Sequence, residues 1–262
     1  MPIDAKVEAE KLRKMYKAAP KQGLTSILMT GESGTGKTFS LKNAPFPVHI
    51  DSFDPTGTKS VRDYIEKGFI IPDIRFEEED PFNPSAFELW TKEFEARRVG
   101  KYFNSVGTYV LDSATTWTSA IMNYVQGKRK AAGTVPLWEK DYHPQKVLIE
   151  TWLQKCMNLP CHFILTAHLE PQKDTKGAIV SRRFLMTGKS AIKIPLLFDE
   201  IWVADKKETS KGWEYFFHIE SGGMLLARSR LAGTGKLASN EPNNLRAIFK
   251  KAGLNYADKE SV

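Results

Sequence analysis

The sequence has little cysteine and no long apolar run. Only two cysteines, Cys156 and Cys161, occur among 262 residues, which excludes a disulfide scaffold and a four-cysteine zinc site. Both lie where a helix is expected to lead into a buried strand, so we expect reduced core thiols, as in a cytosolic protein. No apolar run approaches the roughly 18 residues of a membrane helix, and residues 1–22 lack the apolar segment of a secretory signal. We therefore expect a cytoplasmic protein without a membrane partner.

The residues that are present suit a folded domain. Apolar residues make up 41% and aromatic residues 11% of the chain, which is enough to bury a sizeable core. The 38 lysines and arginines exceed the 31 aspartates and glutamates, and the net charge of +7 permits a polyanionic partner without requiring one. Residues 1–22 are polar and charged, so we expect an arm or short helix there and a single domain over residues 23–262.

The domain alternates between two kinds of pattern. Helical patterns separate four apolar runs of strand length, at 24–30, 48–50, 108–111 and 162–167. This alternation predicts an α/β fold with a mainly parallel sheet and helices on both faces. Three later runs predict antiparallel strands along one edge, at 201–204, 213–219 and 224–227.

A glycine-rich motif follows the first strand-length run. Residues 31–38 read GESGTGKT and match G-x-x-x-x-G-K-[ST] in full, between a predicted strand and a predicted helix that extends to about Asn43. The glycines let the backbone curl so that its N–H groups point at phosphate oxygens, while Lys37 reaches the β- and γ-phosphates and Thr38 binds Mg²⁺. The predicted nucleotide-binding residues are Gly31, Glu32, Ser33, Gly34, Thr35, Gly36, Lys37 and Thr38.

A phosphate loop of this kind needs a second carboxylate at the end of a neighbouring strand, to hold Mg²⁺ through water. Asp112 follows the run 108–111 and fits this position, although it could also cap the next helix; Asp51 is the weaker candidate. Ser113 stands where many motor ATPases carry a catalytic glutamate, so the carboxylate that activates water must come from elsewhere. Asp54 is the nearest candidate, and it fits a structural turn residue equally well.

Taken together, these segments resemble the phage-encoded RecA-like core ATPases, which are related to the RecA recombinases. The similarity spans 24–253 and is carried by GESGTGKT, VHIDSFDP, YVLDSATT, FILTAH and LLARSR. It implies a P-loop NTPase fold of RecA type, ATP and Mg²⁺ as cofactors, and ATP hydrolysis. It further implies single-stranded DNA as a partner in recombination or replication, a homo-oligomeric ring or filament, and a phage single-strand-binding protein as a further partner in the bacterial host.

The resemblance also assigns roles to individual residues. His168, in FILTAH, takes the place of a polar γ-phosphate sensor, and residues 169–190 take the place of mobile DNA-binding loops. Arg228 and Arg230 lie near the strand from which relatives offer a basic finger to the ATP of a neighbouring subunit. The chain departs from the family pattern in two places. The segment SFD replaces the glutamate expected after the second strand, which puts fast hydrolysis in doubt, and the sensor is histidine rather than glutamine.

The segment that takes the place of the DNA-binding loops is basic. Within 173–189 only Asp174 opposes five cations, which are the predicted DNA-binding residues Lys173, Lys176, Arg182, Arg183 and Lys189. Phosphates of a single strand would suit this segment, and Phe184 is available to stack on a base. A solvated surface loop explains the same composition, and the second basic run, 128–130, is a weaker candidate for nucleic acid.

Several functions remain compatible with these patterns. The leading interpretation is an Mg²⁺-dependent ATPase that binds single-stranded DNA and in which His168 reports the γ-phosphate to the basic segment. A nucleotide-gated interaction protein with weak ATPase activity and no DNA binding is the main alternative, because the expected glutamate is missing. A small helicase-type motor and a small-molecule kinase also remain, although no clear signature of a lid or an acceptor pocket is present.

Overall fold

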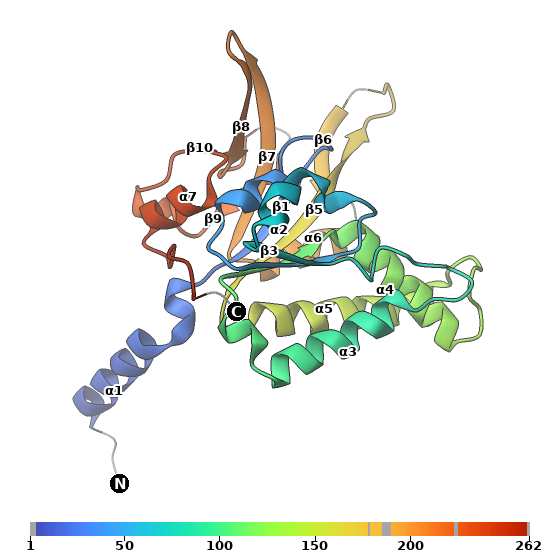
Figure 1. Ribbon diagram of the computed structural model, residues 1–262, viewed down its shortest axis with the longest axis horizontal. Helices are drawn as coiled ribbons and strands as arrows, with labels where there is room; N and C mark the ends of the chain where they lie inside the picture. Colours follow the sequence, from blue (N-terminus) through green and yellow to red (C-terminus); the bar gives the residue numbers. More distant parts are fainter. Residues whose placement is uncertain (1–3, 178, 185–189, 223–224, 261–262) are drawn as a thin grey trace.

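The computed structural model describes residues 4–177, 179–184, 190–222 and 225–260. Figure 1 shows a twisted sheet between two layers of helices, with the N-terminal helix projecting away from the body. The strands are β1 (Ser26–Gly31), β2 (Val48–Ser52), β3 (Ile70–Asp73), β4 (Thr108–Asp112), β5 (His162–Lys173), β6 (Ile179–Phe184), β7 (Glu200–Thr209), β8 (Gly212–His218), β9 (Arg228–Ser229) and β10 (Asn240–Pro242). The α-helices are α1 (Ala5–Ala18), α2 (Arg62–Glu66), α3 (Ala86–Val99), α4 (Ala114–Lys128), α5 (His143–Met157), α6 (Ser190–Leu197) and α7 (Leu245–Ala252).

The sheet has the strand order β10-β8-β7-β1-β5-β4-β2-β3, with β6 added to β5 and β9 to β7. All neighbours from β7 to β3 along this order are parallel, whereas β8 and β10 are antiparallel additions at one edge. Strands β1, β2 and β4 are buried along their whole length, because helices cover both faces of a parallel sheet. The predicted mixed sheet is therefore confirmed.

Two core clusters fill the space between the sheet and its helices. On one face, α3, α4 and α5 pack Trp90, Trp117 and Leu153 against the sheet. On the other face, α7 packs Ile248 and Phe249, together with Leu41 from the segment after the phosphate loop. Figure 1 shows α3, α4 and α5 together below the sheet. The layers fix the positions of the strand ends, and these ends carry the polar groups described below.

The segment after the phosphate loop corrects a prediction. The expected helix is a six-residue 3-10 helix, η2 (Thr38–Asn43), in which the N–H of Ala44 bonds to the carbonyl of Leu41. Pro45 follows at once and disfavours helical geometry in Ala44, so the segment has no room for a full α-helix. A short 3-10 helix has a smaller dipole than an α-helix, so phosphate binding must depend on the loop amides and Lys37.

Smaller differences lie at the edges of the fold. Of the predicted strand at 224–227, residue 224 lies outside the described residues, Leu225 forms only isolated β-bridges, and the strand found here is β9 at Arg228–Ser229. Helix α7 begins after β10 rather than at Asn240, because Asn244 caps it by accepting from the N–H of Ala247. Asp4 likewise caps α1. Among the described residues, none of the helices has the length and apolar character needed to span a bilayer.

Candidate functional site

A cavity of about 410 Å³ lies beside the carboxyl ends of β1, β4 and β5. Parallel sheets commonly bind ligands at this end, where the strand order reverses direction. The cavity is lined by Ser33, Gly34, Gly36, Lys37, Thr38, Phe39, Asp54, Gly57, Ser60, Asp112, His168 and Tyr215. The structure thus gathers four separate sequence segments around the phosphate loop.

The phosphate loop is shaped by close contacts with the edge strands. A Cβ atom on Gly31 would lie 2.6 Å from the carbonyl oxygen of Ala204 on β7, so the loop can approach that strand only with glycine. Gly36 has a φ of +86°, and a Cβ there would lie 2.9 Å from the ring of Tyr215 on β8. Glycines are therefore required here for packing against the edge strands as well as for the curl of the loop.

Lys37 places a buried cation in this loop. Its ammonium donates to the carbonyl oxygens of Gly31, at 2.9 Å, and Glu32, at 2.8 Å, and the residue is only 8% exposed. Burial lowers the pKa of Lys37, and the negative charges of Asp112 and Asp54 partly offset this effect. The loop therefore presents a positive charge together with its backbone N–H groups, which is the arrangement that phosphates require.

Asp112 ends β4 directly opposite Thr38. Its Oδ2 accepts from the Thr38 hydroxyl at 3.2 Å, and its Oδ1 accepts from the hydroxyl of Thr166 on β5. Burial raises the pKa of Asp112, and the hydrogen bond from Thr166 works against that rise. A hydroxyl and a carboxylate converging in this way are the hard oxygen donors that Mg²⁺ prefers, so the residues present fit that ion. Among the described residues, no cluster of three or more His, Cys, Asp or Glu side chains could hold a metal ion.

Asp54 lies in the turn after β2 and faces the same cavity. Its Oδ1 accepts from the hydroxyls of Ser113, at 2.9 Å, and Thr116, at 2.7 Å. Its Oδ2 lies 3.5 Å from Nε2 of His168 at the end of the aligned part of β5. Burial alone would raise the pKa of Asp54, but the hydrogen bonds, with that of His168 first, outweigh burial and lower it. Asp54 is therefore held as an ionised carboxylate.

Two residues that hold this turn were missed by the sequence analysis. The sequence indicated Ser113 only as the residue that stands in place of a catalytic glutamate. In the structure its hydroxyl donates to Asp54 and so positions that carboxylate. Glu77 accepts from the hydroxyl of Ser52, at 2.7 Å, and from the backbone N–H of Thr56, at 3.1 Å, so it braces both sides of the turn. Nothing in the local sequence distinguishes Glu77 from the acidic run that it begins.

Strand β5 continues past His168 and forms a hairpin with β6. The guanidinium of Arg182 on β6 lies 3.0 Å from Oε1 of Glu32, so the hairpin returns to the phosphate loop. Lys176 is exposed between the two strands. Lys173 and Arg183 belong to β5 and β6, and Lys189 lies outside the described residues.

The proposed stacking role of Phe184 is wrong, because this side chain is only 4% exposed and packs in the core. The second basic run is largely neutralised within the chain. Lys128 pairs with Glu88 at 3.2 Å, and Arg129 pairs with Asp141 at 2.7 Å. The β5–β6 hairpin is therefore the stronger candidate for nucleic acid.

Arg228 and Arg230 lie at the opposite end of the sheet from the phosphate loop. Strand β9 pairs with the first residues of β7, at the end where β1 begins. The Arg228 guanidinium donates to the carbonyl oxygen of Phe198 at 2.7 Å, and Arg230 pairs with Asp199 at 3.0 Å. Neither side chain approaches the phosphate loop of its own chain, and a role toward the nucleotide of a neighbouring subunit stays a prediction.

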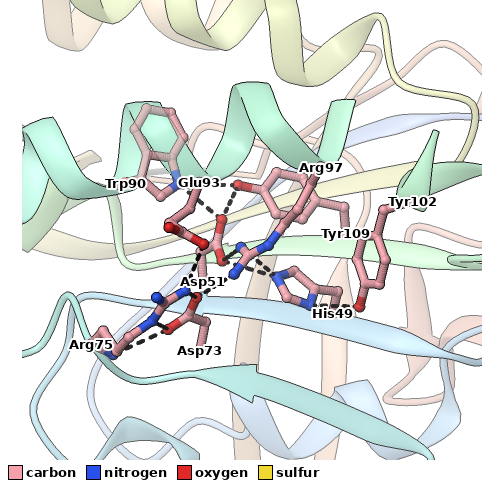
Figure 2. A network of polar contacts seen from close by, with 9 residues as sticks. All are labelled: His49, Asp51, Asp73, Arg75, Trp90, Glu93, Arg97, Tyr102 and Tyr109. Atoms are coloured by element: carbon pink, nitrogen blue, oxygen red, sulfur yellow. Dashed lines mark hydrogen bonds and ion pairs between the residues drawn. The ribbon is translucent and has the colours of Figure 1, made fainter. Parts of the chain in front are cut away.

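The side chain of Asp51, the weaker metal candidate, lies within a network of polar contacts between the sheet and α3 (Figure 2). On β2 its side chain faces α3, and its Oδ2 accepts from Nε1 of Trp90, at 2.9 Å, and the hydroxyl of Tyr109, at 2.7 Å. Its Oδ1 accepts from Arg97 at 2.8 Å and lies 2.9 Å from Nε2 of His49. These bonds occupy the carboxylate and join β2, β4 and α3, so Asp51 does not serve the cavity.

The fold and the phosphate loop define this chain as a P-loop NTPase with a RecA-type sheet. A family model described as an AAA domain matches residues 25–231, and the chain therefore belongs to that family. None of the curated proteins matches the sequence.

The chain is similar to several solved structures. An ATPase from the type III secretion system of pathogenic bacteria is 15% identical with a TM-score of 0.50, over 87% of this chain and 65% of that one. A KaiC-like protein from Pyrococcus horikoshii OT3 is 17% identical with a TM-score of 0.38, over 78% and 81% of the two chains. The flagellar accessory protein FlaH from Methanocaldococcus jannaschii is 14% identical with a TM-score of 0.43, over 82% and 83%. At 15% identity, the similarity to the secretion-system ATPase concerns the fold alone.

Both cysteines are buried free thiols, and burial raises the pKa of Cys161 to about 12. Each is therefore protonated and unreactive at neutral pH.

Proposed function

We propose that this protein is an Mg²⁺-dependent ATPase that binds single-stranded DNA through its β5–β6 hairpin and couples the two events. The observation that carries the proposal is the attachment of the hairpin to the nucleotide cavity at two points. His168 contacts Asp54 at the base of the hairpin, and Arg182 contacts Glu32 on the returning strand. The hairpin therefore contacts the phosphate loop at Glu32 and the turn after β2 at Asp54.

The residues that line the cavity support the hydrolysis part of the proposal. Lys37 and the loop amides bind the phosphates, and Thr38 and Asp112 would hold Mg²⁺, which neutralises phosphate charge when bound. Asp54 is an ionised carboxylate with one oxygen, Oδ2, facing His168 rather than the two hydroxyls, so it can accept a hydrogen bond from water there.

Coupling follows from the groups at the two contacts. A γ-phosphate in the loop is negative, so it repels the carboxylates of Glu32 and Asp54 and attracts the guanidinium of Arg182, and it can accept a hydrogen bond from the ring of His168. Arg182 and His168 both lie on the hairpin. ATP would therefore change the position of the hairpin and expose or order its cations, whereas ADP would not.

Single-stranded DNA fits the charge of the hairpin. Lys176 is exposed, and Lys173, Arg182, Arg183 and Lys189 lie in the same segment of sequence. Binding through phosphates releases counterions, so affinity should fall steeply as salt rises. The resemblance to phage-encoded RecA-like ATPases is the reason to propose recombination or replication in a bacterial host, and a ring or filament in which Arg228 or Arg230 approaches a neighbour's nucleotide.

A nucleotide-gated interaction protein with weak ATPase activity is the second candidate. One observation of the structure favours it: Oδ1 of Asp54 is already bound by two hydroxyls. The sequence agrees, because the segment SFD replaces the glutamate expected after β2. In that case the hairpin would respond to ATP and bind a protein rather than DNA.

The test is ATP turnover by the purified protein with Mg²⁺, alone and with single- or double-stranded DNA, across a salt series. We expect turnover that single strands stimulate and salt suppresses, and that Lys37→Ala abolishes. Matched turnover with and without DNA at low salt, together with undetectable DNA binding, would reject the DNA partner and favour the second candidate.

A further inference from the structure

Two aromatic rings from distant segments line one side of the nucleotide cavity. Phe39 follows Thr38 directly, and Tyr215 lies on β8. Their ring centroids are 6.3 Å apart with planes inclined by 34°, so the rings meet obliquely and form one continuous apolar wall. Neither ring belongs to the two core clusters.

Phe39 is exposed in a way that packing does not explain. Its side chain is 44% exposed although it follows a residue of the phosphate loop, and the Lys42 ammonium lies 4.6 Å from its ring centroid. Exposed apolar side chains are common singly, but this ring is joined by a second ring inside a cavity. The pair is therefore a surface available for a flat apolar ligand.

The sheet order places this wall on the opposite side of the phosphate loop from the charged groups. Strand β1 leads into the loop, with β7 and β8 on one side and β5, β4 and β2 on the other. Tyr215 comes from the first side, whereas Asp54, Asp112 and His168 come from the second. A nucleotide whose phosphates occupy the loop, with its γ-phosphate toward the charged groups, extends its base toward the aromatic wall.

We infer that Phe39 and Tyr215 form the nucleobase subsite, an open stacking surface that accepts adenine and guanine alike. The carboxylates and the histidine of the cavity belong to its charged side. Lys37 and Thr38 serve the phosphates and the metal ion. Of the other polar side chains that line the cavity, those of Ser33, Ser60 and Tyr215 carry hydroxyls, which both donate and accept hydrogen bonds. Such groups pair equally with the amino group of adenine and the carbonyl of guanine. The inference rests on nucleotide binding at the phosphate loop and is independent of DNA binding.

The test compares the affinities of ATP, GTP and inorganic triphosphate by calorimetric titration with Mg²⁺. We expect ATP and GTP to bind within about threefold of each other, and Phe39→Leu to weaken both about tenfold, equivalent to about 1.4 kcal/mol. Inorganic triphosphate should bind the wild type and Phe39→Leu equally, because it has no base. Phe39→Trp should retain the affinity for ATP, and Trp138→Leu, which removes an exposed ring outside the cavity, is the matched control.

Tyr215→Leu provides the second arm, with the same expected pattern. A fall in triphosphate affinity equal to the fall in ATP affinity, in both variants, would overturn the inference and show that the rings shape the loop. Unchanged ATP affinity in both variants, or a preference above about thirtyfold for one purine, would also overturn it. Failure of nucleotide binding itself is distinguishable, because neither ATP nor triphosphate would then bind the wild type, and failure of DNA binding would leave all of these affinities unchanged.

Discussion

Two carboxylates three positions apart in the sequence have opposite roles in this structure. Asp51 is fully buried, and both of its oxygens are bound by protein groups from β2, β4 and α3 (Figure 2). Asp54 lines the nucleotide cavity. Its Oδ1 is bound by two hydroxyls, and its Oδ2 has His168 at 3.5 Å as its one partner among the described residues. The difference shows that a carboxylate whose hydrogen-bonding capacity is used up joins elements together, whereas one with spare capacity can act on a ligand.

The largest expected effect is on stability, at the buried carboxylate. Asp51→Asn removes the charge that faces Arg97 and leaves buried donors without a full partner. We expect the free energy of unfolding to fall by about 3–5 kcal/mol, measured by chemical denaturation. Glu78→Gln, which removes an exposed charge nearby in the sequence, should change it by less than about 0.5 kcal/mol. Equal stability of Asp51→Asn and the wild type would show that the network does not hold the sheet to α3.

The second effect is on turnover, at the cavity carboxylate. Asp54→Asn preserves size and removes the base, so we expect ATP turnover to fall about hundredfold. The free energy of unfolding should change by less than about 1 kcal/mol, because Asp54 is half-buried at the cavity. If this variant instead unfolds like Asp51→Asn while keeping its turnover per folded molecule, the two carboxylates do not differ in role.

The third effect is the dependence of stability on pH, and it concerns the buried residue His162. Its Nδ1 accepts from the N–H of Thr25, its Nε2 lies 2.7 Å from the carbonyl oxygen of Asn255, and burial lowers its pKa to about 4. Between pH 4 and the usual value near 6.5 the unfolded chain binds a proton that the folded chain does not. Stability should therefore rise with pH across that window, by at most about 1.4 kcal/mol per pH unit.

Chemical denaturation at several pH values measures this slope, and His162→Asn should flatten it. Turnover at the nucleotide cavity should not follow the same profile, because His162 begins β5 whereas His168, which faces the cavity, lies six residues further along the strand. A slope that is unchanged in the variant would assign the pH dependence to other groups.

The smallest effect tests the positioning of Asp54. Ser113→Ala removes one of the two hydroxyls on Oδ1 and leaves Thr116 in place. We expect a three- to tenfold fall in turnover, corresponding to about 1 kcal/mol for one hydrogen bond, and a rise in the pH at which activity is lost on the acid side. Such a rise follows because the hydrogen bond from Ser113 helps to lower the pKa of Asp54. Ser119→Ala, which removes an exposed hydroxyl from the same helix, is the control.

The parts of the site that could be predicted from the sequence are those that depend on short runs of adjacent residues. The phosphate loop and Asp112 are recognisable because each depends on a few adjacent residues and a preceding strand. Asp54 followed from its place after β2, although its bonds to Ser113 and Thr116 depend on contacts between segments about sixty residues apart. Glu77 and Tyr215 reach the site only through the tertiary fold, so no local pattern indicated them.

The fold shows the same division. The alternating pattern predicted the parallel sheet because burial on both faces leaves continuous apolar runs. The 3-10 geometry after the loop depends on the competition between a helix start and Pro45, which an apolar pattern does not reveal. Phe184 was misassigned because a ring that anchors a basic hairpin in the core has the same sequence context as one that faces solvent.

The central claim is that the nucleotide cavity and the β5–β6 hairpin are coupled, and the affinity for single-stranded DNA tests it most directly. Fluorescence anisotropy of a labelled strand should be measured with Mg²⁺ and either a slowly hydrolysed ATP analogue or ADP. The account predicts at least about tenfold tighter binding with the triphosphate, a coupling of about 1.4 kcal/mol. Equal affinity in the two nucleotide states would contradict it.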